Sequence, residues 1–228
     1  MTLVLFDIDG TLLRTNGSGR GAMAMTAGEL FGRPDMFDSV SFAGAVDSGI
    51  VALAMEACGI PATGRRMGRM RLRYERRLRR GLKEQPGEVC PGVHRLLSDL
   101  QGRAKVGLIT GNWHGGARIK LEAHGLGSTF AGCVGAYGGD AAERNALLPY
   151  AVKRAFRRWG KMERVLVVGD TPADVACARA GQQRLPDLEV VAVAVETGFS
   201  TVDSLRESEP DLQIVDLDQG REAFLALL

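Results

Sequence analysis

The chain has 228 residues, of which 45% are hydrophobic and 25% charged, and its formal net charge is +2 at pH 7. These values are typical of a folded globular protein and exclude the disordered and fibrous classes. So small a net charge indicates neither a nucleic-acid nor a membrane partner. The first residues, MTLVLFDIDG, lack the pattern of a signal peptide, and the four cysteines form no C-x-x-C pair, so we expect a cytoplasmic protein with reduced thiols.

Four apolar runs, at 3–8, 105–110, 164–170 and 188–195, are rich in Val, Leu and Ile without alternation. Such runs predict strands that are buried on both faces, as in a parallel sheet covered by helices. Helical patterns separate or flank these runs; they lie at 91–102, 117–125, 147–160 and 173–181. The alternation predicts a doubly wound α/β fold with a parallel sheet, in which ligands bind beyond the carboxyl ends of the strands.

Residues 14–90 interrupt this alternation, because they contain helical patterns, at 19–32, 47–59 and 65–81, but no convincing buried strand. We therefore predict two domains. Residues 1–13 and 91–228 form the α/β core, and residues 14–90 form an inserted helical cap.

The third of these helical patterns is strongly basic, with nine arginines between positions 65 and 80. Apolar residues recur among the arginines at roughly helical spacing, which predicts an amphipathic helix with a solvated basic face rather than a nucleic-acid surface. These residues are Met67, Met70, Leu72, Tyr74 and Leu78.

The sequence Asp7-Ile8-Asp9-Gly10-Thr11 lies where the first predicted strand ends and the chain must turn. An Asp-Gly pair often does no more than end a strand and open a turn. Two carboxylates at a strand end and two positions apart can also divide a phosphoryl transfer between them. Asp7 would attack phosphorus, and Asp9 would act as general acid for the leaving group and then as general base for water.

Thr110-Gly111-Asn112 lies at the end of the second predicted strand. A hydroxyl group and unhindered backbone N–H groups beside a helix start suit a phosphate, although Thr and Asn are also common helix-capping residues. We take all three, together with Gly10, as candidate phosphate-binding residues.

The third predicted strand ends in Gly169-Asp170-Thr171-Pro172-Ala173-Asp174. Mg²⁺ prefers oxygen ligands, and the carboxylates of Asp7 and Asp170 together with one backbone carbonyl would supply the protein's share. Asp174 lies one turn into the following helix, where it would interact with the helix dipole or brace the metal ligands.

Several carboxylates beside a phosphate require a cation to offset their repulsion. Arg144 and Lys153 are the candidates. Arg144 is preferred because it lies in a turn-rich segment, whereas Lys153 lies within a predicted helix whose basic residues more often face water.

These motifs resemble those of the haloacid dehalogenase-like hydrolases: DIDGTL at 7–12 is similar to their first motif, Thr110 to their second and GDTPAD at 169–174 to their fourth. The resemblance implies an aspartyl-phosphate on Asp7, acid/base catalysis by Asp9 with its carbonyl on the metal, and Asp170 as a further ligand. In the family the third-motif residue is usually a Lys that precedes the Asp of the fourth motif, and its distance along the chain from Asp170 favours Arg144 for this position. The insertion resembles the helical cap of the phosphoglycolate phosphatase and β-phosphoglucomutase branch.

We therefore expect a Mg²⁺-dependent phosphatase that acts on a small-molecule phosphate ester and exists as a monomer or homodimer. Two alternatives stay open: a phosphosugar mutase, and a phospho-acceptor or binding module without turnover. Dehalogenation is disfavoured because dehalogenases of the family lack the second Asp of the first motif, which is Asp9 here.

Overall fold

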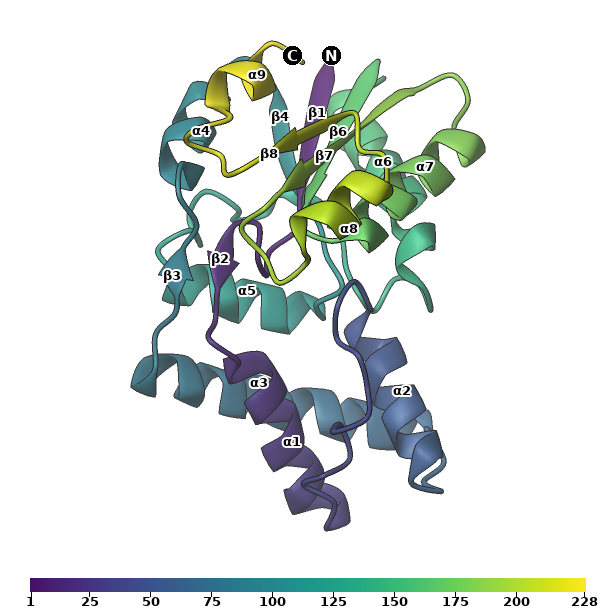
Figure 1. The fold of residues 1–228 in the computed structure, drawn as a ribbon. Helices are drawn as coiled ribbons and strands as arrows, with labels where there is room; N and C mark the ends of the chain where they lie inside the picture. Colours follow the sequence, from purple (N-terminus) through teal and green to yellow (C-terminus); the bar gives the residue numbers. More distant parts are fainter.

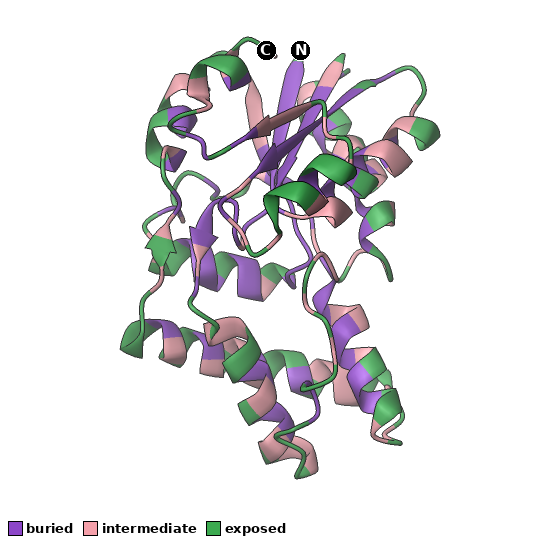
Figure 2. Ribbon diagram, in the orientation of Figure 1, coloured by how far each residue is buried: buried purple, intermediate pink, exposed green.

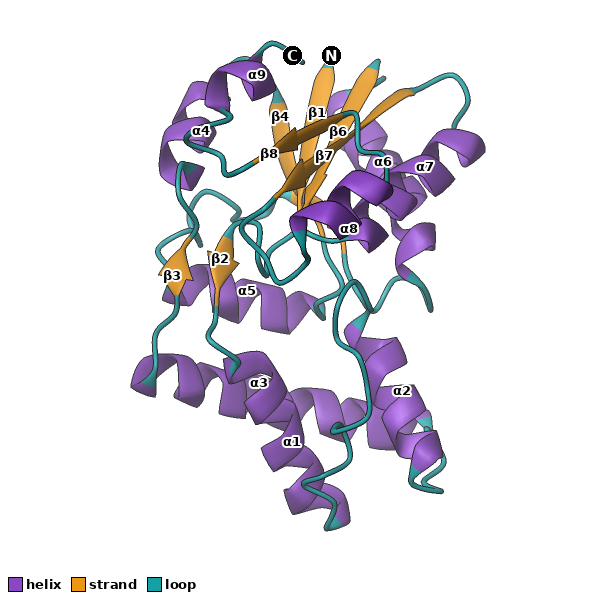
Figure 3. Cartoon of the chain, viewed as in Figure 1, coloured by secondary structure: helices purple, strands orange, loops and turns teal.

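The computed structural model describes residues 1–228, and its centre is a six-stranded parallel sheet with the strand order β5-β4-β1-β6-β7-β8 (Figures 1 and 3). The four predicted strands are confirmed as β1 (Thr2–Phe6), β4 (Lys105–Ile109), β6 (Arg164–Gly169) and β7 (Glu189–Val195). Two short edge strands were not predicted, β5 (Val134–Ala136) and β8 (Leu212–Ile214). The doubly wound fold class is confirmed.

Helices cover both faces of the sheet, and the side chains of β1 alternate between them. Val4 and Phe6 pack with α4 (Val93–Asp99), α5 (His114–Ala123) and α9 (Arg221–Leu225) on one face. Leu3 and Leu5 pack with α6 (Leu147–Trp159) and α7 (Pro172–Arg184) on the other. Figure 2 shows the central strands β1, β6 and β7 as mostly buried. The remaining short helices are η1 (Arg144–Ala146) and α8 (Val202–Glu207).

The predicted insertion is helical and has its own hydrophobic cluster, built from α1 (Ser18–Phe31), α2 (Asp47–Ala57) and α3 (Gly64–Glu84). We call these three the cap helices. Trp113 and Ile119, at the start and in the middle of α5, belong to the same cluster. Helix α5 therefore packs against both the sheet and the cap, and it lies between the sheet and α3 in Figure 1.

The chain enters and leaves the insertion through a short antiparallel ladder of β2 (Leu13–Arg14) and β3 (Glu88–Val89). Sequence reasoning did not predict this pair, because each strand has only two residues. The ladder lies close to the predicted limits of the insertion, but the boundaries 14 and 90 themselves stay a prediction.

The arginine-rich helix α3 is amphipathic as predicted, and it buries Met70, Tyr74, Leu78 and Leu82 at intervals of one turn. Leu72 departs from the prediction, since 55% of it is exposed. It lies two positions from Met70 and from Tyr74, and in a helix that spacing faces the opposite side. None of the helices is long and apolar enough to cross a membrane.

Candidate active site

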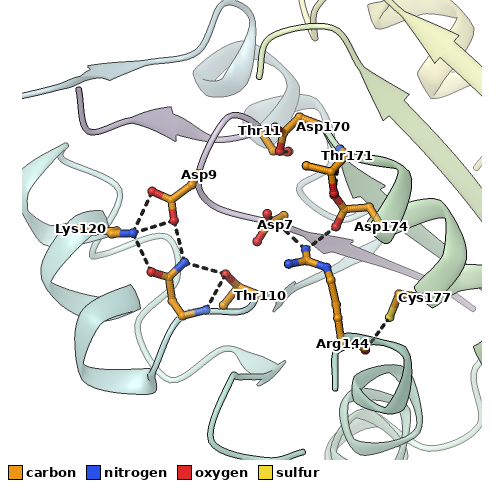
Figure 4. Close-up of polar contacts among 11 residues, drawn as sticks. Asp7, Asp9, Thr11, Thr110, Lys120, Arg144, Asp170, Thr171, Asp174 and Cys177 are labelled. Atoms are coloured by element: carbon orange, nitrogen blue, oxygen red, sulfur yellow. Dashed lines mark hydrogen bonds and ion pairs between the residues drawn. The ribbon is translucent and has the colours of Figure 1, made fainter. Parts of the chain in front are cut away.

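The polar residues predicted at strand ends lie together at the carboxyl edge of the sheet. Strand β1 pairs with β4 on one side and β6 on the other, so Asp7, Thr110 and Asp170, each directly after its strand, are neighbours. Figure 4 shows them with Asp9, Arg144 and Asp174 around one centre. A cavity of about 650 Å³ opens over this centre, and its lining includes both core residues and residues of the cap helices.

Asp7 is buried at the floor of the cavity. Its Oδ2 lies 3.2 Å from an Arg144 nitrogen, whereas its Oδ1 is buried without any hydrogen-bond partner. Burial raises the pKa of Asp7 to about 6, with Arg144 opposing the rise and the carboxylates of Asp174 and Asp9 adding to it. The unpartnered oxygen is therefore positioned to take a ligand that the protein itself does not supply.

Arg144 is buried at the start of η1 and forms ion pairs with both Asp7 and Asp174. Burial alone would lower the pKa of this guanidinium, but the two carboxylates raise it above its ordinary value. Arg144 is thus a permanent buried cation in contact with Asp7. Lys153, the other candidate, is exposed on α6.

Asp170 is buried and accepts a hydrogen bond of 3.1 Å from the Thr11 hydroxyl. Two glycines make room for its carboxylate, since a Cβ on Gly10 would lie 2.4 Å, and one on Gly198 1.7 Å, from Asp170 Oδ2. Gly10 also has a φ of +81°, which side chains rarely adopt. Burial, followed by Asp174 and Asp7, raises the pKa of Asp170 well above its ordinary value.

Asp174 caps its own helix and also contacts Arg144. Its Oδ2 accepts hydrogen bonds from the Thr171 backbone N–H at 3.0 Å and the Thr171 hydroxyl at 2.7 Å, while its Oδ1 accepts one from Arg144. Asp174 can therefore both stabilise the start of its helix and brace the neighbouring candidate metal ligands, the two functions expected for it.

The acidic cluster suits a divalent cation. Asp7, Asp170 and Asp174 are all buried, and one oxygen of each lies within 4.8 Å of the others. Burial is the main cause of the raised pKa values of Asp7 and Asp170, and the neighbouring carboxylates add to it despite Arg144. An all-oxygen donor set with an unpartnered Asp7 Oδ1 is chemically suited to a hard cation such as Mg²⁺.

The Asp9 carboxylate lies beside this cluster and is directed toward Lys120 (Figure 4). Lys120 Nζ lies 2.8 Å from Asp9 Oδ1 and 2.6 Å from Oδ2, and Asn112 Nδ2 donates to Oδ2 at 2.7 Å. The same Asn112 amide donates to Thr110 Oγ1 at 2.8 Å. Thr110 and Asn112, both predicted phosphate-binding residues, are therefore linked to the predicted acid/base by hydrogen bonds.

Gly111 lies between these two residues and against the segment that leads into α2. A Cβ on Gly111 would lie 2.0 Å from the Ala45 carbonyl oxygen, so no other residue fits there without movement. The Gly111 carbonyl accepts the Asp47 backbone N–H at 2.7 Å, and Asp47 Oδ2 accepts the Trp113 backbone N–H at 2.8 Å. The cap is thereby hydrogen-bonded to the loop that carries Asn112.

Sequence reasoning did not identify Lys120 or Asp47, both buried and both lining the cavity. Each lies on a helix rather than at a strand end. The sequence signal for Lys120 was a charged residue at an apolar helical position, between Ile119 and Leu121. Thr11, which holds Asp170, was already inside the first motif but had no assigned contact.

The comparisons with known proteins agree with this architecture. Residues 1–182 match the family model of the haloacid dehalogenase-like hydrolases. The chain is 29% identical over 222 residues to a phosphoglycolate phosphatase of Rhodospirillum rubrum. The alignment covers 87% of this chain and 88% of the relative.

Solved structures show the same fold at lower identity. CbbY of Rhodobacter sphaeroides, in complex with phosphate, aligns with a TM-score of 0.70 at 15% identity over 96% of this chain and 95% of that one. A β-phosphoglucomutase of Clostridium difficile aligns with a TM-score of 0.70 at 16% identity, over 99% and 95% of the two chains. With the family match over most of its length, the chain belongs to the haloacid dehalogenase-like hydrolases.

Proposed function

We propose that the protein is a Mg²⁺-dependent phosphatase that hydrolyses a small-molecule phosphate monoester through an aspartyl-phosphate on Asp7. The observation that carries the proposal is the environment of Asp7. This buried carboxylate has one oxygen beside Arg144 and the other without a partner, and it lies beside two further carboxylates at the floor of a large cavity. A nucleophile that receives a phosphoryl group needs an oxygen that is not engaged in another contact, together with nearby positive charge.

Asp7 and Asp9 have separate roles in this reaction. Asp7 attacks phosphorus and the ester oxygen leaves, taking a proton from Asp9. Asp9 then accepts a proton from the water that attacks the aspartyl-phosphate, which releases inorganic phosphate and restores Asp7. Arg144 and the Thr110 hydroxyl stabilise the charge on the transferred group.

Asp7, Asp170 and the Asp9 carbonyl would hold Mg²⁺, with Asp174 bracing them through Arg144. When bound, the cation offsets the negative charge of carboxylate and phosphate as they approach each other.

Phosphoglycolate is the first substrate to test, because a phosphatase of that name is 29% identical to this chain over most of both lengths. The cavity of about 650 Å³ also has room for larger esters. The cytoplasmic location and the monomeric or dimeric state stay predictions.

The test measures phosphate release from phosphoglycolate, a panel of sugar phosphates and p-nitrophenyl phosphate, with Mg²⁺ or with EDTA. Wild type should turn over at least one ester only with Mg²⁺, and Asp7→Asn should lose that activity by several orders of magnitude. Residual Asp7→Asn turnover near the wild-type rate would contradict the nucleophile assignment. Isomerisation of a sugar phosphate without phosphate release would favour a mutase, and phosphorylation of Asp7 without turnover would favour a phospho-acceptor.

A further inference from the structure

Lys120 is a buried lysine whose ammonium group lies entirely among oxygen atoms of the site. It contacts Asp9 Oδ1 at 2.8 Å, Asp9 Oδ2 at 2.6 Å and Asn112 Oδ1 at 2.6 Å. An ammonium group has three N–H donors, so these three contacts use all of them. Lysine is seldom fully buried, because its charge loses hydration that only close partners can replace. The position of Lys120 therefore depends on Asp9 and Asn112.

Asn112 completes a closed set of contacts around the same carboxylate. Its amide nitrogen donates to Asp9 Oδ2 and to Thr110 Oγ1, while its amide oxygen accepts from Lys120. Asp9 follows β1, but both side chains that hold its carboxylate, Asn112 and Lys120, come from the segment after β4. Its orientation is consequently set by a different part of the chain from the one that places its backbone.

The cap supports the same arrangement from the other side. Asp47 binds the Gly111 carbonyl and the Trp113 N–H, the two backbone groups that flank Asn112. At the start of α1, a Cβ on Gly19 would lie 3.6 Å from Lys120 Nζ, so the cap passes close over the ammonium group. The Asp9 side chain nevertheless stays 37% exposed and lines the cavity, so it remains open to a substrate.

We propose that Lys120 is a positioning residue that, with Asn112, holds the Asp9 carboxylate in the orientation from which it delivers a proton to the leaving-group oxygen. This inference rests on the proposed phosphatase function. A contact that only stabilises the fold would affect all esters alike. A contact that orients the general acid matters most where the leaving group needs a proton.

The experiment compares kcat/KM for two esters in wild type, Lys120→Met and Lys120→Arg. One is the best alkyl phosphate of the panel, whose alkoxide needs a proton; the other is p-nitrophenyl phosphate, whose phenolate leaves without one. The ratio kcat/KM reports the steps up to departure of the leaving group. For Lys120→Met we expect a loss of about 100-fold on the alkyl ester and less than about 5-fold on the aryl ester. Lys120→Arg should recover part of the alkyl activity.

Asp9→Asn supplies the reference, since it should show the same selective loss. Adding Lys120→Met to Asp9→Asn should cause little further loss on the alkyl ester, because the two residues act as one unit. Thermal melting verifies folding, and Lys120→Gln, which keeps a hydrogen-bond donor, replaces the Met variant if that one unfolds.

Equal losses on both esters, fully additive losses in the double variant, or faster alkyl turnover without Lys120 would each overturn the inference. A wild-type protein that hydrolyses neither ester, under any metal condition, would instead count against the proposed function itself.

Discussion

At the scale of single residues, the most unusual group outside the predicted motifs is Asp47. It is buried at the first turn of α2, and burial raises its pKa to about 7, with Lys120 opposing the rise and Asp9 and Asp7 adding to it. Its only side-chain partner is the Trp113 backbone N–H, which a neutral carboxyl or an amide oxygen can satisfy equally well.

This predicts a pH-dependent difference in stability between wild type and Asp47→Asn. Between about pH 4 and pH 7 the folded protein binds a proton on Asp47 that the unfolded chain does not bind. The free energy of unfolding therefore falls as pH rises through this range, by at most about 1.4 kcal/mol per pH unit for one group. Urea denaturation in EDTA should show that the stability of Asp47→Asn relative to wild type increases from pH 5 to pH 8. A constant difference across that range would contradict the prediction.

Residue types also explain how far the site could be predicted from the sequence. Asp7, Thr110 and Asp170 end buried strands, and parallel strands bring their ends to one edge whatever the details of packing. Lys120 and Asp47 lie on helices, where the rotation of the helix decides whether a side chain faces the cavity or the solvent. That rotation is set by contacts such as Trp113 with the cap, which a single sequence does not reveal.

At the scale of elements, the longer strands could be predicted from the sequence, whereas the short ones could not. The runs at 3–8 and 164–170 are mostly apolar and rich in Val and Leu, so their strands could be predicted to within one or two residues. Strand β5 has three residues, Val-Gly-Ala, and takes its form from pairing with β4 rather than from its own propensity. The β2–β3 ladder depends entirely on two segments that meet across the length of the cap.

The contact of α3 with α5 gives a prediction at this scale. A Cβ on Gly68 in α3 would meet nothing within 4 Å, whereas one on Gly116 in α5 would lie 3.2 Å from Tyr74 Cε1. Gly68→Ala should therefore raise the free energy of unfolding by about 0.5–1 kcal/mol, since alanine favours helix. Gly116→Ala should lower it relative to Gly68→Ala by about 1–3 kcal/mol, because the Tyr74 ring must shift.

Chemical denaturation of the two variants tests this directly. Tyr74 also packs edge-on against Trp113, with the ring centroids 5.7 Å apart, so Gly116→Ala should change the tryptophan fluorescence as well. Equal stability of the two variants would mean that the α3–α5 contact is looser than the structure indicates.

At the scale of the whole molecule, the acidic cluster predicts that metal binding and stability are coupled. Burying Asp170 beside Asp7 and Asp174 costs free energy unless a cation offsets their charge, as its raised pKa indicates. Asp170→Asn should therefore be more stable than wild type in EDTA at pH 8, since its amide oxygen can still accept the Thr11 hydrogen bond.

Mg²⁺ should reverse this order. At about 100 times its dissociation constant, a ligand adds about 2.7 kcal/mol to wild type, or about 5–10 °C in melting temperature for a chain of this size. Asp170→Asn should show little response, while Asp187→Asn, at an exposed aspartate, should behave as wild type. Scanning calorimetry with and without Mg²⁺ provides the measurement, and an equal shift in wild type and Asp170→Asn would exclude Asp170 as a ligand.

The β2–β3 ladder has a consequence for how such a protein diversifies. The chain leaves the core at Leu13 and returns at Val89, and these two residues are paired neighbours. Insertions, deletions or wholesale replacement of the intervening residues need not change the distance between these two anchor points. The strand ends that carry Asp7, Thr110 and Asp170 all lie outside that interval. A change in the length of the insertion can therefore leave these three strand ends in place.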